Sequence, residues 1–586
     1  MDRIIEAYLN DFRKEYNFSE NLEQSKLFEY FVNYCIISRL YPERFPLEDI
    51  SVGGGGDMAL DGVAIIVNDN LVFSPEEVDD LKAKLHRLDV KFIFIQSKSG
   101  NKFDVAKIGN FLFGVESFFD KETSGYINED IQNLRYLKEY IYDLSIDMSH
   151  NPICEMYYVT TGKWENDSNL RKRINAGEKT LRKTDLFDES ENGVKFVPVD
   201  AEYLKIIYKE IRNKVDKKIN FDKHTILPKI DKVDEAYIGI LPATEYLKLI
   251  CANDGTLLRN LFNDNVRDFQ GNNPVNQEIT DTINDEGRRG GFVLFNNGIT
   301  IVAKSILKTG SDFTIRDFQI VNGCQTSHIL YNNKESLDNN VFLPLKIIVT
   351  SDEEVTNRII KATNRQTEVK QEAFLSLLPF QKYLEEFYAS FTGNSRLYYE
   401  RRSKQYDNQT PAIDKSKIVS ITIQIRCFMS MFLCEPHSTH RYYGELYETN
   451  SKKIFVEGHS YYPYYISCYA LYSLDNLFKY KKVDSSYKRW YKYHLLMIFR
   501  LIATKNINFT QINRKKLDNY CAELQKIIQN EEELIKIFKQ AISIIDVALI
   551  EFKNKKYTDG QLSRRKFFTD KLINLAEQEH QKVTLE

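Results

Sequence analysis

The spacing of hydrophobic and polar residues divides the first third of this chain into helices and strands. Apolar residues recur at helical spacing before residue 45, which predicts helices there. Short runs of β-branched or aromatic residues, bounded by Gly, Asp, Asn or Pro, predict strands at residues 50–53, 62–67, 91–98, 155–161 and 194–199. Helical periods separate these runs at residues 105–119, 131–144, 169–182 and 201–213. The pattern predicts an α/β domain over residues 1–215.

A lysine-rich stretch at residues 214–232, which has no clear periodicity, is the predicted boundary to a second domain. Beyond it, helices are predicted at residues 241–250 and 256–261, and strands at residues 292–295, 299–303, 313–321 and 343–349. From residue 371 the pattern is helical and rich in Tyr and Phe, most clearly at residues 418–431, 491–503 and 534–552. We therefore predict a multidomain α/β protein with a mixed α+β domain at residues 216–385 and a mainly helical part at residues 386–586.

Composition agrees with a folded, multidomain chain. It has 586 residues, 42% hydrophobic and 28% charged, with only 25 Gly and 13 Pro, so little of it is linker. The formal net charge is only -3, from 80 basic and 83 acidic residues, and any nucleic-acid surface must therefore be local.

Cysteine placement and hydropathy limit the class of protein further. The eight cysteines are scattered without a CxxC pair, which argues against a zinc ribbon and a disulfide framework. No apolar run approaches the roughly 20 residues that a membrane helix needs, and the N-terminus lacks a basic start followed by an apolar run. We expect a cytoplasmic protein with no membrane partner.

Candidate chemistry is concentrated around a glycine-rich turn, Gly-Gly-Gly-Gly-Asp-Met-Ala-Leu-Asp-Gly at residues 53–62, and the later run Phe-Ile-Phe-Ile-Gln-Ser-Lys at residues 92–98. Side chains alternate faces along a strand, so Gln96 and Lys98 point the same way, and Asp61, entering the neighbouring strand, is expected to lie opposite them. Asp61 offers a hard oxygen for Mg²⁺, Gln96 a carbonyl oxygen, and Lys98 an ammonium group for the attacking water. Glu29, on a helix with an apolar opposite face, would complete the site.

The order of these motifs resembles the Mrr-type branch of the PD-(D/E)xK nucleases. Phe-Glu on a first helix, Gly-Gly-Asp-x-x-x-Asp-Gly and then apolar-Gln-x-Lys carry the likeness, which extends over about residues 20 to 213. The resemblance implies a restriction-endonuclease-like fold and a Mg²⁺-dependent nuclease, with Mn²⁺ as a substitute. It implies a catalytic site of Glu29, Asp61, Gln96 and Lys98, with Asp61, Gln96 and Glu29 as metal ligands and Asp57 as a helper. A plain structural interpretation stays open, because Asp-Gly is a common hairpin turn, Lys98 would suit a solvated face, and Asp57 would serve as a turn residue.

A second set of motifs follows at residues 265–269, 295–300, 320–327 and 362–367. Their order resembles the AIPR family, named for abortive infection and phage resistance, from about residue 225 past Tyr-Tyr-Glu-Arg-Arg at residues 398–402. The resemblance implies bacterial antiphage defence and does not by itself imply a reaction.

The turn at Gly323 in this region is predicted to join a strand to a helix that Thr326 or Ser327 caps. Such a helix N-terminus suits a phosphate, and the layout is similar to ParB-like and DGQHR-type domains. The candidate phosphate or nucleic-acid ligands of this region are Arg267, Asn322, Gln325, Thr326 and Arg365. The alternative is that these Asn and Gln residues satisfy buried backbone, and that residues 296–298 form an ordinary hairpin turn.

Residues 396–406 interleave Tyr with cations, including Arg401 and Arg402, as nucleic-acid binders do. The rings would equally serve to pack helices together. His437 and His440 have a metal-like spacing, but no partner Cys or His pattern supports zinc.

Together these features predict an antiphage nuclease that hydrolyses DNA with Mg²⁺, its rear region sensing nucleic acid or a phage-derived or nucleotide trigger. RNA stays open as the substrate. The alternative is a nucleic-acid-binding or nucleotide-sensing defence protein with an inactive nuclease fold. A homodimer would cut both strands more easily because it has two sites, although no residue pattern indicates one.

Overall fold

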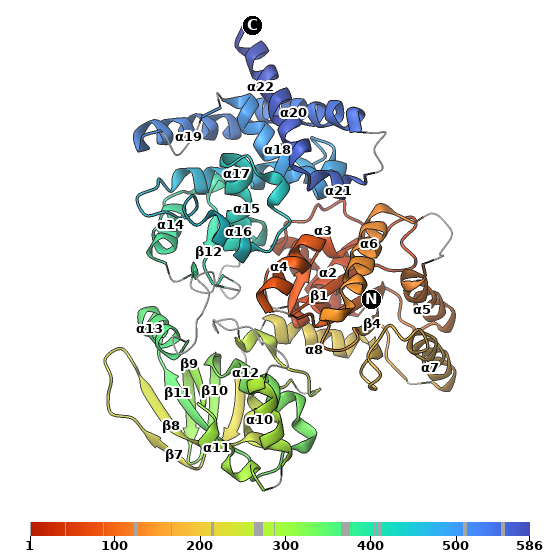
Figure 1. Ribbon diagram of the computed structural model, residues 1–586, viewed down its shortest axis with the longest axis vertical. Coiled ribbons are helices and arrows are strands. Elements are labelled where there is room, and N and C mark those ends of the chain that lie inside the picture. The colour runs from red at the N-terminus through yellow and green to blue at the C-terminus, as the bar shows by residue number, and fades with distance from the viewer. Residues whose placement is uncertain are drawn as a thin grey trace.

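The chain folds into three parts, two built on β-sheets and one of helices (Figure 1). The computed structural model describes residues 2–585 except for residues 42, 86, 122–126, 166, 213–215, 253, 263–273, 286, 365–374, 377, 403–404, 407–412, 505, 508–511 and 553–556. In Figure 1 the helical part lies at the top, the central sheet at the bottom, and the N-terminal α/β part on the right between them. The predicted mixed α/β architecture with a helical C-terminal region is confirmed.

The N-terminal part is a five-stranded sheet in the order β2-β1-β3-β4-β5. Strand β1 pairs antiparallel with β2 and β3, whereas β3, β4 and β5 run parallel. Its strands are β1 (Gly62–Val67), β2 (Asn70–Val72), β3 (Val90–Lys98), β4 (Ile153–Thr160) and β5 (Val194–Val199). Its helices are α1 (Arg3–Glu15), α2 (Gln24–Leu40), α3 (Leu47–Ile50), α4 (Pro75–Leu85), α5 (Val105–Phe119), α6 (Glu129–Asp143), α7 (Ser168–Arg182) and α8 (Ala201–Arg212).

Strand β3 is buried on both faces because its side chains enter two hydrophobic cores. Phe92 and Phe94 pack with residues of α5, α6 and α7, while Ile93 and Ile95 pack with residues of α1, α2 and α8. This period of two sends Gln96 toward the side of Phe92 and Phe94. The strand is thus held from both sides up to the point where its polar residues begin.

The central part is a six-stranded sheet in the order β6-β10-β9-β11-β8-β7. All neighbours pair antiparallel except β11 and β9, which are parallel. The strands are β6 (Asp216–Asn220), β7 (His224–Ile226), β8 (Glu235–Pro242), β9 (Ile299–Thr309), β10 (Asp312–Asn322) and β11 (Phe342–Val349). The helices are α9 (Ala243–Ile250), α10 (Pro274–Asn284), α11 (Phe292–Phe295), α12 (Cys324–Asn332) and α13 (Glu353–Asn364).

The C-terminal part packs helices around one large core rich in Tyr and Phe. A short parallel pair, β12 (Tyr398–Glu400) and β13 (Ile418–Ser420), lies at its start. The helices are α14 (Pro379–Ala389), α15 (Ile421–Phe432), α16 (Tyr443–Asn450), α17 (Tyr462–Lys479), α18 (Lys488–Ala503), α19 (Arg514–Gln529), α20 (Glu531–Phe552), α21 (Asp559–Ser563) and α22 (Lys566–Leu585). None of the helices in the described part of the chain combines the length and apolar character needed to cross a bilayer.

Two strand predictions are wrong. Residue 50 is the last residue of the one-turn helix α3, and residues 51–53 contribute only an isolated bridge, Ser51 with Gly62. Residues 292–295 form the one-turn helix α11, because four apolar residues fit a buried helical turn as well as a strand. Residues 214–232, predicted to be aperiodic, contain β6 and β7 of the second sheet. All eight cysteines are free thiols, as their scattered placement predicted.

Candidate functional site

Asp61 is held in place by its backbone immediately before β1. Its N–H donates to Ile95 O at 2.9 Å, and its carbonyl oxygen accepts from Val52 N and from Asn33 Nδ2, each at 3.2 Å. Gly62 pairs with Ile95 in the register of β1 and β3, so Asp61 lies beside Gln96. Gly62 has to be small, because a Cβ there would lie 2.4 Å from Asn33 Oδ1.

The Asp61 carboxylate gathers polar groups from the end of β3. Its Oδ2 accepts hydrogen bonds from Gln96 Nε2 at 2.5 Å, from Ser97 N at 2.7 Å and from Ser97 Oγ at 2.9 Å. Lys98 Nζ lies 3.9 Å from the same oxygen. Gln96 is 2% exposed, whereas the Lys98 side chain is 38% exposed. The structure therefore brings Asp61, Gln96 and Lys98 together as the alternation of side chains predicted, and Lys98 is the most exposed of the three.

Glu29, the fourth predicted site residue, lies on helix α2 and not on the sheet. Its side chain pairs with Lys26 Nζ at 2.5 Å and lies against Gly53, where a Cβ would approach Glu29 Oε1 to 2.8 Å. Burial, together with the nearby Asp61 and Asp57, raises the pKa of Glu29 to about 7, even though Lys26 lowers it. The carboxylates of Asp61 and Asp57 therefore lie close enough to Glu29 to raise its pKa.

The glycine-rich turn is held by Asp57. Its two carboxylate oxygens accept from Gly54 N and from Ala59 N, each at 2.9 Å. Gly56, Met58 and Ala59 have φ of 78°, 57° and 58°, a left-handed path that non-glycine residues seldom adopt. Asp57 therefore acts as a turn residue, which was one of the two roles that the sequence left open. It also places a negative charge near Glu29.

The oxygen donors of this group suit a hard divalent cation. Asp61, Gln96 and Glu29 supply only oxygens as metal ligands, which Mg²⁺ prefers. Within the described chain no donor is bonded to Asp61 Oδ1, and the raised pKa of Glu29 reflects a carboxyl group buried beside two others. No three His, Cys, Asp or Glu side chains among the described residues are arranged to hold a metal, so Gln96 would have to act as a ligand.

Two contributors were not predicted from the sequence. Ser97 alternates to the opposite face from Gln96, yet its backbone N–H and its hydroxyl both reach Asp61. Lys26 lies one helical turn before Glu29, and this spacing is the signal that would have found it.

The turn at Gly323 differs from its prediction. Gly323, at φ 103°, is the N-cap of α12, and neither Thr326 nor Ser327 caps this helix. Ser327 Oγ donates back to Gly323 O at 2.7 Å, and Asn296 Nδ2 donates to Thr326 Oγ1 at 2.9 Å. A hydroxyl one turn into a helix lies beyond the unpaired N–H groups that a capping side chain reaches. It bonds the carbonyl oxygen one turn earlier instead.

Two more of the predicted phosphate ligands flank the same turn. Asn322 ends β10, opposite Thr300, and Gln325 lies in the first turn of α12. Arg267 and Arg365, with the motif at residues 265–269 and residues 365–367, lie outside the described residues.

The two C-terminal arginines bond side chains of two different parts of the chain, Arg401 within the helical part and Arg402 with the central part. Arg401 Nε pairs with Glu385 Oε2 at 2.5 Å and its side chain is 9% exposed, while Arg402 bonds Asn357. Their role in nucleic-acid binding stays a prediction.

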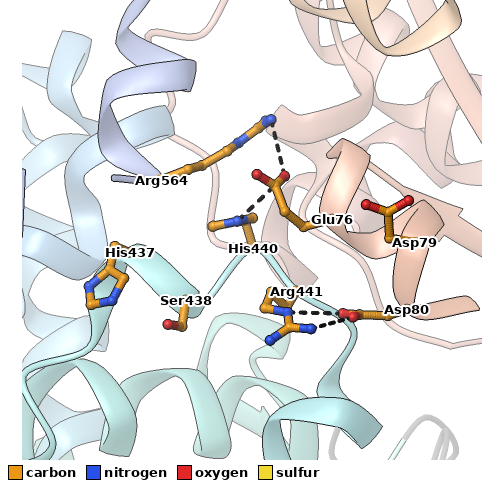
Figure 2. A pocket seen from close by; sticks show the side chains of 8 residues that line it. All are labelled: Glu76, Asp79, Asp80, His437, Ser438, His440, Arg441 and Arg564. Carbon is orange, nitrogen blue, oxygen red and sulfur yellow. Dashed lines mark hydrogen bonds and ion pairs between the residues drawn. The ribbon is translucent and has the colours of Figure 1, made fainter. Parts of the chain in front are cut away.

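A polar hollow of about 260 Å³ lies where α4 meets the helical part (Figure 2). Its lining residues are Glu76, Asp79, Asp80, His437, Ser438, His440, Arg441 and Arg564. His440 Nε2 and Arg564 Nη1 face Glu76 Oε2 at 3.5 and 3.8 Å, and Arg441 pairs with Asp80 at 2.5 Å. Burial alone would raise the pKa of Glu76, but His440 and Arg564 lower it to about 2. These pairs cross between the two parts of the chain, and the hollow is a domain contact.

The helical part also reaches the elements that support the glycine turn. Lys488 bonds Glu48, and Arg489 Nη1 pairs with Asp130 Oδ2 at 2.6 Å near the start of α6. The N-cap of α6, Asn128, donates to Gly56 O at 3.1 Å and to Val52 O at 3.0 Å. A continuous set of contacts thus runs from α18 to the turn beside Glu29.

Comparison with known proteins gives a family match for the rear of the chain. Residues 262–541 match the family model described as AIPR protein. No curated protein and no solved structure matches the chain.

Proposed function

Since residues 262–541 match the AIPR protein family, we propose that this chain is an antiphage defence protein whose N-terminal part is a metal-dependent nuclease. The family, whose name stands for abortive infection and phage resistance, suggests the defence role. The nuclease proposal rests on one observation: Asp61, Gln96 and Lys98 converge at the ends of two strands, beside a buried Glu29. DNA is the proposed substrate, with RNA as an outcome of the test.

Each residue has a distinct task in this proposal. Asp61, Gln96 and Glu29 would hold Mg²⁺, and a bound divalent cation would neutralise phosphate charge and make water more acidic. Ser97 holds Asp61 through two hydrogen bonds, which orients the carboxylate before any cation arrives. Lys98, half exposed beside Asp61, would contact the attacking water or the phosphate oxygen and stabilise charge in the transition state.

The rear of the chain would regulate this site. Arg489 lies within the AIPR-matching residues and pairs with Asp130, whose helix holds the glycine turn through Asn128. A nucleic acid or phage-derived signal bound to the rear region would act on the site by shifting this contact. Such coupling requires the signal to favour one arrangement of the contact over the other.

A second candidate, a nucleic-acid-binding module that does not cut, is favoured by one observation. Among the described residues no three acidic or histidine side chains form a metal group, and Gln96 is a neutral and weaker ligand than a carboxylate. Affinity for Mg²⁺ would then be too low for catalysis.

Cleavage by the purified full chain distinguishes these proposals. Supercoiled plasmid, linear duplex, single-stranded DNA and RNA are incubated with Mg²⁺ or Mn²⁺, using wild type, Lys98→Ala and, as a matched control, exposed Lys209→Ala. We expect cutting by wild type and Lys209→Ala and at least a hundredfold loss, roughly, in Lys98→Ala. Equal cutting by all three proteins would refute the site, and binding without cutting in every condition would support the second candidate.

A further inference from the structure

Two loops meet at the edge of the N-terminal sheet where the candidate site lies. Strands β3 and β4 are parallel, with Lys98 opposite Thr160, so the β3–α5 loop and the β4–α7 loop leave the sheet at the same edge. Thr161 N and Thr160 Oγ1 donate to Gly100 O at 3.1 and 2.9 Å. A Cβ at Gly162 would lie 2.2 Å from Asn101 O, so the loops are in direct contact.

Cations cluster on these loops and on the first two turns of the helices that follow them. We define the basic edge as Lys98, Lys102, Lys107, Lys163, Lys172 and Arg173. All of these residues except the half-exposed Lys98 are exposed, and Arg173 crosses from α7 to α5, where a Cβ on Gly109 would meet its guanidinium at 2.7 Å. A chain with a net charge of only -3 therefore concentrates positive charge at the edge that holds the site.

The carboxylates on the same loops are partly committed to the helices. Asp104 accepts from Lys107 N as the N-cap of α5, and Asp167 accepts from Asn169 N and Leu170 N as the N-cap of α7. Both helices start at this edge, so their N-terminal dipole ends add to its positive potential. Their last turns lie at the opposite edge of the sheet.

We propose that the basic edge binds the phosphate backbone of a nucleic acid and leads it to Lys98. Several exposed cations on two joined loops match a polyanion with regularly spaced charges, and ligands of parallel sheets bind at the carboxyl ends of the strands. That the bound nucleic acid leads to Lys98 rests on the proposed nuclease function. The binding itself requires no cleavage.

Salt-dependent binding of the full chain tests the proposal. A fluorescein-labelled duplex, and a single strand of the same sequence, are titrated in EDTA with wild type and with Lys102→Ala/Lys163→Ala/Lys172→Ala. The control Lys179→Ala/Lys183→Ala/Lys209→Ala removes the same charge from exposed positions at the opposite ends of α7 and α8. Thermal melting checks that all three proteins are folded.

We expect the edge variant to bind at least about tenfold more weakly than the control at low salt. The slope of log affinity against log salt should fall by about 0.9 for each lost contact with duplex phosphate. Equal affinity and slope in the two variants, or no binding by wild type, would overturn the proposal. Weaker binding by the edge variant, with no cutting by wild type in Mg²⁺, would support the surface while rejecting the nuclease.

Discussion

Two glycine turns in this chain place polar residues beside a strand. They differ in the partners that these polar side chains have. At the first turn, residues 53–56, charged side chains from different elements converge, and the pKa of Glu29 rises to about 7 through burial and the nearby Asp61 and Asp57. At the second turn, at Gly323, the polar groups bond one another, as Asn296 does with Thr326 and Ser327 with Gly323 O.

This difference predicts how each turn responds to substitution. A carboxyl group buried beside other carboxylates is unfavourable when ionised, and such a group is often retained where it serves a cation or a substrate. Hydroxyl and amide groups that are satisfied by their own chain hold a turn together and so contribute to stability. The first turn is therefore expected to respond to substitution in activity, and the second in stability.

The largest effect is expected for Asp61→Asn. The substitution keeps the shape of the side chain but removes the charge that would hold a cation, so cleavage should fall by about a hundredfold or more. Asn296→Ala at the second turn should lower the free energy of unfolding by about 1 kcal/mol through its lost hydrogen bonds and leave the cleavage rate unchanged. Initial rates on the preferred substrate and urea unfolding measure the two quantities. Loss of cleavage in Asn296→Ala alone would reverse the assignment of the two turns.

Glycine substitutions separate activity from stability. A Cβ at Gly53 would lie 2.8 Å from Glu29 Oε1, the end of a side chain that can move, so Gly53→Ala should shift Glu29 and lower cleavage about tenfold. Gly323→Ala combines a φ of 103° with a Cβ 2.7 Å from Ile299 Cγ1 and should cost about 2 kcal/mol of stability.

Gly55→Ala is the control for these variants, because a Cβ there has nothing within 4 Å. Its cleavage rate and melting temperature should match those of wild type. If Gly53→Ala also matches wild type, Glu29 has no part in the reaction.

Much of the first turn could be predicted because its determinants are local. Alternation along residues 91–98 placed Gln96 and Lys98 on one side, and the burial of Phe92 to Ile95 on both faces keeps that strand regular. Ser97 was missed because alternation sends its side chain away from Gln96, whereas its backbone and hydroxyl still reach Asp61.

The features that could not be predicted depend on contacts between residues far apart in the sequence. The apolar residues 292–295 are too few to distinguish a strand from a helical turn. The pairing of Arg441 with Asp80 joins residues far apart in the sequence, and no local pattern in a single chain indicates it. The same applies to Arg489 and Asp130.

Stability should depend on pH through Glu29. Its pKa is about 7 in the folded chain against the ordinary 4.5, so the native state binds more protons between these pH values. The free energy of unfolding therefore falls as pH rises from 4.5 to 7, by about 2 kcal/mol without added metal. Glu29→Gln should remove this fall, whereas exposed Glu116→Gln should not. Urea unfolding across this range in EDTA measures it, and identical pH profiles for both variants would exclude Glu29 as the titrating group.

The smallest effect on cleavage is expected at the contact between the helical part and α6, the helix whose N-cap holds the first turn. Arg489→Ala breaks the pair with Asp130, whose partly exposed side chains limit the stability loss to about 1 kcal/mol or less. Since Asn128 of the same helix holds Gly56 and Val52, cleavage should fall about threefold. Arg289→Ala is the matched control, because it breaks a similarly exposed pair with Asp338 in the central part. If both variants lose the same stability and neither changes the rate, the helical part does not act on the first turn through Arg489. A slower rate in Arg489→Ala alone would tie the AIPR-matching region to the proposed nuclease site.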